Sequence, residues 1–308
     1  MNDLIGDIHG YANRLSALLE KMGYQDKGGH YVHPTRLAVF LGDFIDRGKK
    51  IRETIHLVRN MVEAGTALAV MGNHEFNALC FHTDDPHSSG YLRSHTQNHF
   101  KQHRATLEAF DGHSAEWQET LNWFRTLPIF LDLGGVRVVH ACWDDGLLEV
   151  AGWLPNNHPV DTSFLVEASR KGSELYGAIE TLLKGPEIPL PDGAITDKDG
   201  VSRTKIRFRW WLEPSTRTYG EVALGYDGEM LQWIPDRPIP QEFHHLFPTY
   251  LSDQKPVFIG HYWMNGARPE RVATNIACLD YSVAKGGPMV AYRWDGEAEI
   301  DNSKFVTA

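Results

Sequence analysis

Acidic and imidazole side chains follow glycine-flanked apolar runs at five places in the sequence. GDIHG at 6–10, GDFIDRG at 42–48 and GNHE at 72–75 follow three such runs in the first part of the chain. VHA at 139–141 and GH at 260–261 follow two more. Carboxylate, imidazole and carboxamide groups without thiolate form a ligand set that suits transition-metal ions. The pattern therefore predicts metal-dependent chemistry.

The segment GDFIDRGKK at 42–50 admits two interpretations. A nucleotide-binding P-loop needs GxxxxGK followed by Ser or Thr, with backbone amides that cradle phosphate. Here the two glycines lie one residue too far apart, and Lys50 stands where Ser or Thr is required. In the second interpretation Asp43 and Asp46 serve a cation and Arg47 binds an anion. Only this interpretation also explains the polar residues after the other apolar runs.

The apolar patterns indicate which elements position these residues. Runs typical of buried strands alternate with segments whose apolar residues recur at helical spacing. The predicted strands are 3–5, 36–41, 66–71, 136–140, 256–261, 275–280 and 289–294, and the predicted helices are 11–22 and 51–62. We expect the last two strands to form a meander and residues 185–204 to be loop. This alternation of strands and helices predicts an α/β fold with a largely parallel core, in which ligands bind at the carboxyl ends of the strands.

Six candidate ligands exceed what one tetrahedral ion requires. They suit two ions that share a bridging carboxylate, and Asp43 is the natural bridge. The candidates are Asp7, His9, Asp43, Asn73, His140 and His261. Two divalent ions with two aspartates keep a net positive charge, which can hold a hydroxide and a phosphoryl oxygen.

The composition narrows the function further. The chain has 308 residues and a net charge of −10, and we expect one domain, 1–308, with a helical cap inserted at 81–127. The acidic balance disfavours nucleic acid as a partner. The three cysteines form no CxxC pair, so a thiolate zinc site is not expected. No apolar run could cross a bilayer and the N-terminus lacks a signal peptide, which predicts a cytoplasmic protein without a membrane partner.

The quoted motifs, in this order and at these separations, resemble the calcineurin-like metallophosphoesterases, specifically the phosphoprotein-phosphatase branch. The resemblance implies a four-layer α/β/β/α sandwich with two metal ions at the strand ends, manganese first and iron or zinc as alternatives. It assigns one ion to Asp7, His9 and Asp43. It assigns the other ion to Asp43, Asn73, His140 and His261.

The same resemblance implies roles for three further residues. His74, oriented by Asp46, is expected to be the general acid that protonates the leaving oxygen. Arg47 is expected to grip two phosphate oxygens. A metal-bound hydroxide would then attack phosphorus in line, so the protein is expected to be a hydrolase of phosphate esters or phosphoanhydrides.

The substrate stays open between two types within this branch. The segments GHYW at 260–263 and LDYSVAKGG at 279–287 are similar to bacterial symmetrical diadenosine-tetraphosphatases, whereas DRG at 46–48 also fits bacterial Ser/Thr protein phosphatases. A phosphoprotein, a nucleotide or a dinucleoside polyphosphate is therefore expected as substrate. A nuclease is less consistent with the negative net charge of the chain. An inactive binding module is less consistent with the complete set of candidate ligands.

Two secondary patterns leave alternatives open. The segment SRTKIRFRWW at 202–211 could supply a second phosphate-binding arginine, an aromatic shelf for a nucleobase, or a strand with alternating exposed charges. The candidates for the second arginine are Arg203, Arg207, Arg209 and Arg217. His95, His99 and His103 have helical spacing, and we expect a solvated helix face rather than a contribution to the site.

Overall fold

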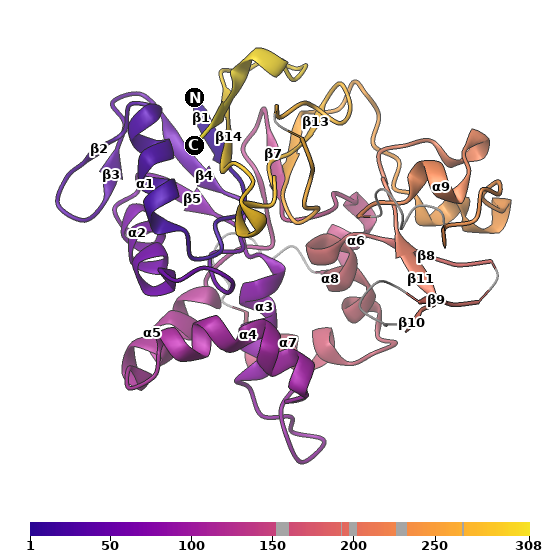
Figure 1. Ribbon diagram of the computed structural model, residues 1–308, viewed down its shortest axis with the longest axis horizontal. Helices are drawn as coiled ribbons and strands as arrows, with labels where there is room; N and C mark the ends of the chain where they lie inside the picture. The colour runs from indigo at the N-terminus through magenta and orange to yellow at the C-terminus, as the bar shows by residue number, and fades with distance from the viewer. Residues whose placement is uncertain (152–159, 192, 197–201, 226–232, 267) are drawn as a thin grey trace.

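The computed structural model describes residues 1–151, 160–191, 193–196, 202–225, 233–266 and 268–308. A five-stranded sheet lies on the N-terminal side of the fold (Figure 1). In spatial order it contains β15 (Phe305–Thr307), β14 (Val290–Trp294), β1 (Asn2–Ile5), β4 (Leu37–Phe40) and β5 (Ala67–Ala69). β1, β4 and β5 are mutually parallel, as the alternation of strands and helices predicts, whereas β14 pairs with β1 in the antiparallel sense.

A four-stranded sheet forms the second half of the sandwich. In spatial order it contains β13 (Ile276–Cys278), β12 (Val257–Ile259), β7 (Arg137–Val139) and β6 (Phe130–Asp132). β12 is parallel to both of its neighbours, and β6 is antiparallel to β7. An apolar core joins the two sheets, with Val39 and Tyr292 from the first sheet and Val138 and Phe258 from the second. All four side chains are fully buried, so the two sheets pack face to face.

Helices cover the outer faces of both sheets. α1 (Ala12–Lys21) and α2 (Ile51–Glu63) place their apolar faces on the first sheet, as the helical spacing predicts. α6 (Asp145–Val150) and α8 (Glu174–Lys184) lie on the side of the second sheet, where the backbone N–H of Ala141 donates to the carbonyl of Leu182. The resulting order of helices, sheet, sheet and helices confirms the expected four-layer sandwich.

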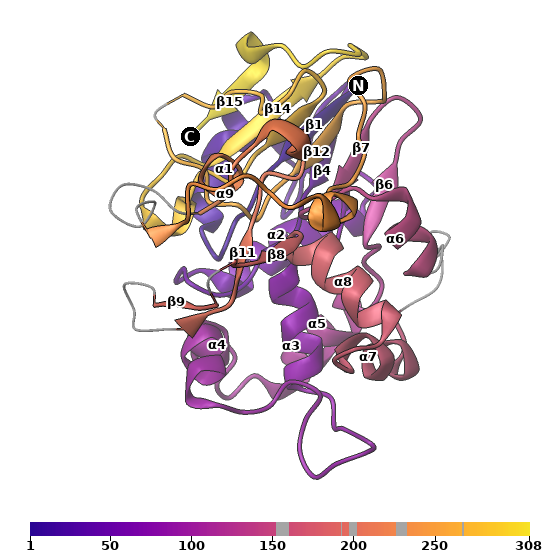
Figure 2. The same ribbon diagram turned by 90° about the vertical axis from the view of Figure 1, so that its right-hand side faces the viewer.

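A group of helices lies at the end of the molecule opposite β14 and β15 (Figure 2). It contains α3 (Asn73–Phe81), α4 (Gln97–Ala109), α5 (Ser114–Phe124) and α7 (Thr162–Ser169). α4 has 13 residues and α5 has 11, so these helices make up about half of the range 81–127. That this range is an insertion within a single domain over 1–308 stays a prediction.

Two expectations about strands are wrong. The segments at 275–280 and 289–294 do not form a meander, because β13 pairs with β12 in the second sheet and β14 pairs with β1 in the first. The chain at 286–288 crosses from one sheet to the other, and both strands are buried. An apolar pattern therefore cannot tell which sheet each joins.

The range 185–204 is not wholly loop. It contains β8 (Glu187–Pro189), β9 (Ile195–Thr196) and β10 (Ser202–Arg203), while residues 192 and 197–201 lie outside the described chain. β8 pairs with β11 (Lys205–Arg207), and β9 pairs with β10. The described chain also contains β2 (Gln25–Asp26), β3 (Tyr31–Val32), α9 (Tyr219–Val222) and 3-10 turns at Pro214–Thr216, Gln241–Leu246, Val283–Lys285 and Asn302–Lys304. None of the described helices combines the length and the apolar character that a membrane span requires.

Candidate metal centre

The polar side chains that follow five strands converge at one edge of the sandwich. They are Asp7 and His9 after β1, Asp43 after β4, Asn73 at the start of α3 after β5, His140 after β7 and His261 after β12. Since strands from both sheets end here, the edge collects residues from opposite ends of the sequence.

The possible ligand atoms form two groups that share one carboxylate. One group contains His9, Asp43 and His74. The other contains Asp43, His140 and His261, and in each group the ligand atoms lie within 4.8 Å of one another. Asp43 therefore lies between the two groups, at the place of a bridging ligand.

Asp7 and Asn73 complete the arrangement. The Oδ2 atom of Asp7 lies 3.8 Å from Nε2 of His9, and both carboxylate oxygens accept from the backbone N–H of His261 at 3.2 Å. The Oδ1 atom of Asn73 lies 3.1 Å from Nε2 of His140 and 2.7 Å from Nδ1 of His261. All six predicted ligands are thus brought together.

The backbone is in the left-handed region at many of these positions. Of the seven non-glycine residues with positive φ in the described chain, five belong to the predicted site. They are His9 (49°), Asp43 (55°), Asp46 (66°), Arg47 (68°) and His261 (68°). Such conformations cost about 1–3 kcal/mol each and concentrate where function fixes the geometry.

Two motif glycines allow the backbone to approach the carboxylates. A Cβ atom on Gly72 would lie 2.2 Å from Oδ1 of Asp43, and one on Gly260 would lie 2.1 Å from Oδ1 of Asp7. Both separations are far below van der Waals contact, so GNHE and GH require glycine as their first residue.

Glu75 fixes the corner that carries Asp43, a role that sequence reasoning did not assign. Its buried carboxylate accepts from the backbone N–H groups of Asp43 and Phe44, both at 2.8 Å, and of Gly72 at 3.0 Å. Burial and repulsion from Asp43 raise the pKa of Glu75 to about 7. A cation on Asp43 would remove that repulsion and favour the ionised carboxylate, which the three N–H donors need.

Hydrogen bonds to backbone carbonyls set the tautomers of two histidines. Nδ1 of His9 donates to the carbonyl of Ile45 at 3.0 Å, and Nδ1 of His140 donates to the carbonyl of Leu41 at 2.7 Å. A carbonyl can only accept, so Nε2 of each neutral ring carries the free lone pair. Nε2 of His9 is buried without a hydrogen-bond partner and lies 3.7 Å from Oδ2 of Asp43. An unpartnered lone pair beside a carboxylate fits a metal ion between them.

The pKa values of the candidate ligands are shifted in ways that a bound cation would explain. Burial and repulsion from Asp280 raise the pKa of Asp7 well above its usual value, whereas burial lowers the pKa of His9 to about 4. Burial lowers the pKa of His140, but the charge of Asp43 outweighs it and raises that pKa to about 10. Neutral His9 and mutually repelling carboxylates are the arrangement that a bound cation stabilises.

Asp46 connects His74 to the helical group. Nδ1 of His74 lies 2.5 Å from Oδ2 of Asp46, while Oδ1 accepts from Nδ1 of His103 at 2.9 Å and from Oγ1 of Thr106 at 2.5 Å. Burial opposes ionisation of Asp46, but the bonds from His103 and His74 hold its pKa below its usual value. Burial likewise lowers the pKa of His74, but Asp43 and Asp46 outweigh it and raise that pKa, which favours the protonated imidazole.

The expectation of a solvated histidine face at 95–103 is wrong for His103. This residue is buried on α4 and contacts Asp46. His95 lies before the helix, which begins after its N-cap Thr96, so the three histidines do not share one helical face. Sequence spacing could not show this, because the inward face of α4 is polar and packs on a buried carboxylate.

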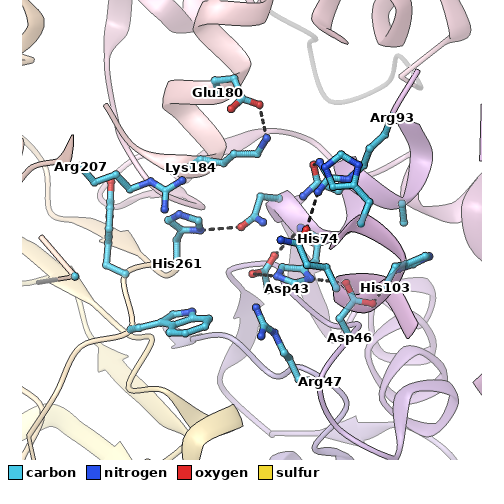
Figure 3. Close-up of a pocket in the computed structure, with 18 of the residues that line it drawn as sticks. Asp43, Asp46, Arg47, His74, Arg93, His103, Glu180, Lys184, Arg207 and His261 are labelled. Atoms are coloured by element: carbon cyan, nitrogen blue, oxygen red, sulfur yellow. Dashed lines mark hydrogen bonds and ion pairs between the residues drawn. The ribbon is translucent and has the colours of Figure 1, made fainter. Parts of the chain in front are cut away.

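A cleft of about 820 Å³ opens above these residues, and Figure 3 shows side chains that line it. Among the described residues, seven cationic side chains line the cleft although the protein is acidic. They are Arg47, Arg93, Lys184, Arg203, Lys205, Arg207 and Lys285. Such a concentration of charge favours an anionic substrate.

The structure reduces the candidates for a second arginine. Arg203 and Arg207 line the cleft. Arg209 donates to the carbonyl of Glu221, Arg217 lies 3.3 Å from the carboxylate of that residue, and neither lines the cleft. Nε of Arg207 is buried without a hydrogen-bond partner, and its charge lowers the pKa of His261 beyond the effect of burial.

The aromatic residues of the same segment do not form a shelf in the cleft. Trp210 is buried and donates to the carbonyl of Ala141 at 3.2 Å, and Trp211 packs against Tyr262 with ring centroids 5.9 Å apart. Trp263 does line the cleft, but the guanidinium of Arg47 lies 5.0 Å and Nζ of Lys285 lies 4.0 Å from its ring centroid. This ring therefore positions cations.

Comparisons with known proteins agree with this geometry. The model of the calcineurin-like phosphoesterase family matches residues 3–190. A segment of 73 residues, 23% of this chain, is 49% identical to the asymmetrical bis(5'-nucleosyl)-tetraphosphatase PrpE of Halalkalibacterium halodurans, and the match spans only 30% of that relative. The symmetrical bis(5'-nucleosyl)-tetraphosphatase of Baumannia cicadellinicola subsp. Homalodisca coagulata is 23% identical over 96% of this chain and 90% of its own length.

A solved structure shares the fold over the whole chain. A protein serine/threonine phosphatase from Saccharomyces cerevisiae superimposes with a TM-score of 0.50 at 13% identity, covering 100% of this chain and 78% of that one. The family match extends over more than half of the sequence and includes four of the five motifs. The chain belongs to the calcineurin-like phosphoesterase family, whose members are metal-dependent enzymes that use two ions.

Proposed function

We propose that this protein is a dinuclear metal-dependent phosphoesterase that hydrolyses a phosphate ester or phosphoanhydride. The observation that carries the proposal is the pair of ligand groups that share Asp43. The unpartnered Nε2 atom of His9 beside this carboxylate supports it, because a buried lone pair without a donor is unfavourable unless a ligand occupies it.

The residues that would hold the two ions follow from the strand ends. Asp7, His9 and Asp43 would bind one ion, and Asp43, Asn73, His140 and His261 the other. When bound, such ions supply a water of lowered pKa and positive charge for phosphoryl oxygens. The oxygen and nitrogen donors suit manganese, which we propose as the native metal, and also iron or zinc.

The remaining site residues act directly on the substrate. His74 would protonate the leaving oxygen from Nε2, because Asp46 fixes its Nδ1–H. Arg47 would grip two phosphate oxygens, supported by Trp263. Of the remaining candidates, Arg207 is the better second arginine, because it lines the cleft on the side of His261 and its buried Nε atom forms no hydrogen bond, its carboxylate neighbour Glu187 lying 3.8 Å away.

A second candidate function is symmetrical hydrolysis of dinucleoside tetraphosphates. The cationic residues occupy both sides of the cleft, with Arg93 on one side and Arg207 on the other (Figure 3). A polyphosphate carries charge on both sides of its scissile bond, whereas a phosphomonoester carries it on one. The full-length similarity to a symmetrical tetraphosphatase also supports this candidate. A phosphoprotein or simple nucleotide remains the alternative substrate, and we propose that the protein acts in the cytoplasm.

The direct test uses metal-stripped protein with Mn²⁺, Zn²⁺ or Mg²⁺ added back. We expect turnover of p-nitrophenyl phosphate, diadenosine tetraphosphate or a phosphopeptide with at least one metal. ADP as the only product from the tetraphosphate identifies the symmetrical reaction. Absence of turnover of all three substrates with every metal would overturn the proposal.

Two substitutions separate the proposed roles. Asp43→Asn should lose bound metal, whereas His74→Asn should retain it and slow turnover by about 10²–10⁴-fold. Loss of metal from His74→Asn would show that this imidazole is a ligand rather than the acid, as its proximity to His9 and Asp43 permits.

A further inference from the structure

Arg93 is a cleft residue that belongs to none of the sequence motifs. It lies between α3 and α4 and lines the cleft together with His74 (Figure 3). Its guanidinium donates from Nη1 to the side-chain oxygen of Asn77 and from Nη2 to that of Gln102, each at 2.9 Å. Two neutral amides on two helices therefore fix the direction of this cation.

The charge of Arg93 has no carboxylate partner. Over the described ranges, no acidic side chain forms an ion pair with its guanidinium. The two acids whose field reaches it are already engaged: Glu180 pairs with Lys184, and Asp46 accepts from His74 and the buried side chains of α4. Burial lowers the pKa of Arg93, but a guanidinium stays charged at any physiological pH. A fixed, half-buried and unpaired cation in a cleft is a binding site for an anion.

The position of Arg93 indicates which part of the substrate it meets. Arg93 lines the cleft on the side of His74 and Asp46, whereas Arg207 lies beside His261 on the other side (Figure 3). If His74 protonates the leaving oxygen, the leaving group lies on the side of Arg93. An anionic site there selects substrates whose leaving group carries its own phosphate.

We propose that Arg93, held by Asn77 and Gln102, forms a subsite for a phosphate of the leaving group, so that this enzyme prefers phosphoanhydride substrates with a diphosphate leaving group. In such a reaction a water oxygen forms the new bond to phosphorus. The bond to the bridging oxygen breaks, and its electron pair leaves with the diphosphate, which takes a proton from His74. The proton that the water loses returns to solvent. The inference rests on the proposed function, because it uses His74 to locate the leaving group.

The first test measures anion binding without turnover. Orthophosphate and methylenediphosphonate, an analogue of pyrophosphate whose bridging carbon cannot be hydrolysed, are titrated calorimetrically into manganese-loaded wild type, Arg93→Gln, Arg93→Lys and Arg104→Gln. Arg104 is the matched control, because it lies on α4 with its side chain 72% exposed and does not line the cleft. We expect Arg93→Gln to weaken methylenediphosphonate binding by about tenfold or more and to change orthophosphate binding by less than about twofold. The affinity of Arg93→Lys should lie between those of wild type and Arg93→Gln, because lysine keeps the positive charge but lacks the planar pair of N–H donors of a guanidinium.

The second test compares leaving groups. Arg93→Gln should lower kcat/KM for diadenosine tetraphosphate by about tenfold or more and leave kcat/KM for p-nitrophenyl phosphate within about twofold. Equal losses for both anions, or no loss for either, would overturn the subsite. If the wild type turns over neither these two substrates nor a phosphopeptide with any of the added metals, the proposed function fails, while the binding test still decides whether Arg93 recognises a second phosphate. Arg93→Lys decides the same question if the glutamine variant does not fold.

Discussion

The backbone turn that carries Asp43 is held in place by Glu75. The substitution Glu75→Gln tests this role, because it replaces one oxygen by an NH₂ group at nearly the same size. The native carboxylate accepts three backbone N–H groups, from Gly72, Asp43 and Phe44. A carboxamide has only one acceptor oxygen, so its NH₂ group faces at least one of these buried donors. One unsatisfied N–H group costs about 1–3 kcal/mol, and the loss of charge at the remaining bonds raises the total to about 2–4 kcal/mol.

This free energy predicts a measurable shift in thermal unfolding. The chain has 308 residues, and an unfolding entropy of roughly 2.1 cal/mol/K per residue converts the loss into a decrease in Tm of about 3–6 °C. Calorimetry of the metal-free protein at a pH above the pKa of Glu75, which is raised to about 7, keeps this carboxylate ionised and measures the shift without a contribution from metal binding. Because the same corner positions Asp43, the variant should also bind Mn²⁺ more weakly.

The control for this variant is Glu53→Gln, which makes the same change at an exposed position of α2. We expect its Tm and its affinity for Mn²⁺ to match the wild type. If Glu75→Gln behaved like Glu53→Gln in both measurements, the inference that Glu75 organises the metal edge would be refuted.

Two further variants probe other contacts. His103→Leu removes one hydrogen bond from Asp46 and should slow turnover of phenyl phosphate by about 3–10-fold. It should slow p-nitrophenyl phosphate less, because that leaving group needs less protonation; equal effects on both would argue against a link to the acid. Arg36→Gln removes the nearer of two cations on the fully buried Asp3, at 2.7 Å, and leaves Arg293 at 3.3 Å, so it should lower the free energy of unfolding in urea by about 1–3 kcal/mol. Arg59→Gln, at an exposed pair, should change it by about 0.5 kcal/mol or less, and similar losses in both would contradict the importance of burial.

The sequence was sufficient to predict that the candidate metal ligands meet at one edge of the sandwich, because the signals for them are local. Each candidate ligand follows an apolar run that ends at or near glycine, and the carboxyl ends of parallel strands meet at one edge. The glycines of GNHE and GH have a steric cause, since a side chain there would collide with Asp43 or Asp7. The helices at 11–22 and 51–62 were also predictable, because their apolar faces are regular.

Features that depend on tertiary contacts were not predictable. The inward face of α4 carries His103 and Thr106. Polar side chains on a helix predict a solvent-exposed face, and only the tertiary structure shows that these two contact Asp46. β13 and β14 have similar apolar patterns but belong to different sheets, and pattern alone does not assign a sheet. Arg93 is held by amides from two helices, so no local motif marks it.

The central claim is that Asp43 holds two metal ions in one site. The most direct measurement is Mn²⁺ content per chain together with the electron paramagnetic resonance spectrum of the loaded protein. We predict two ions per chain with an exchange-coupled spectrum, and loss of that coupling in Asp43→Asn. One ion per chain with an uncoupled spectrum in the wild type would contradict the account.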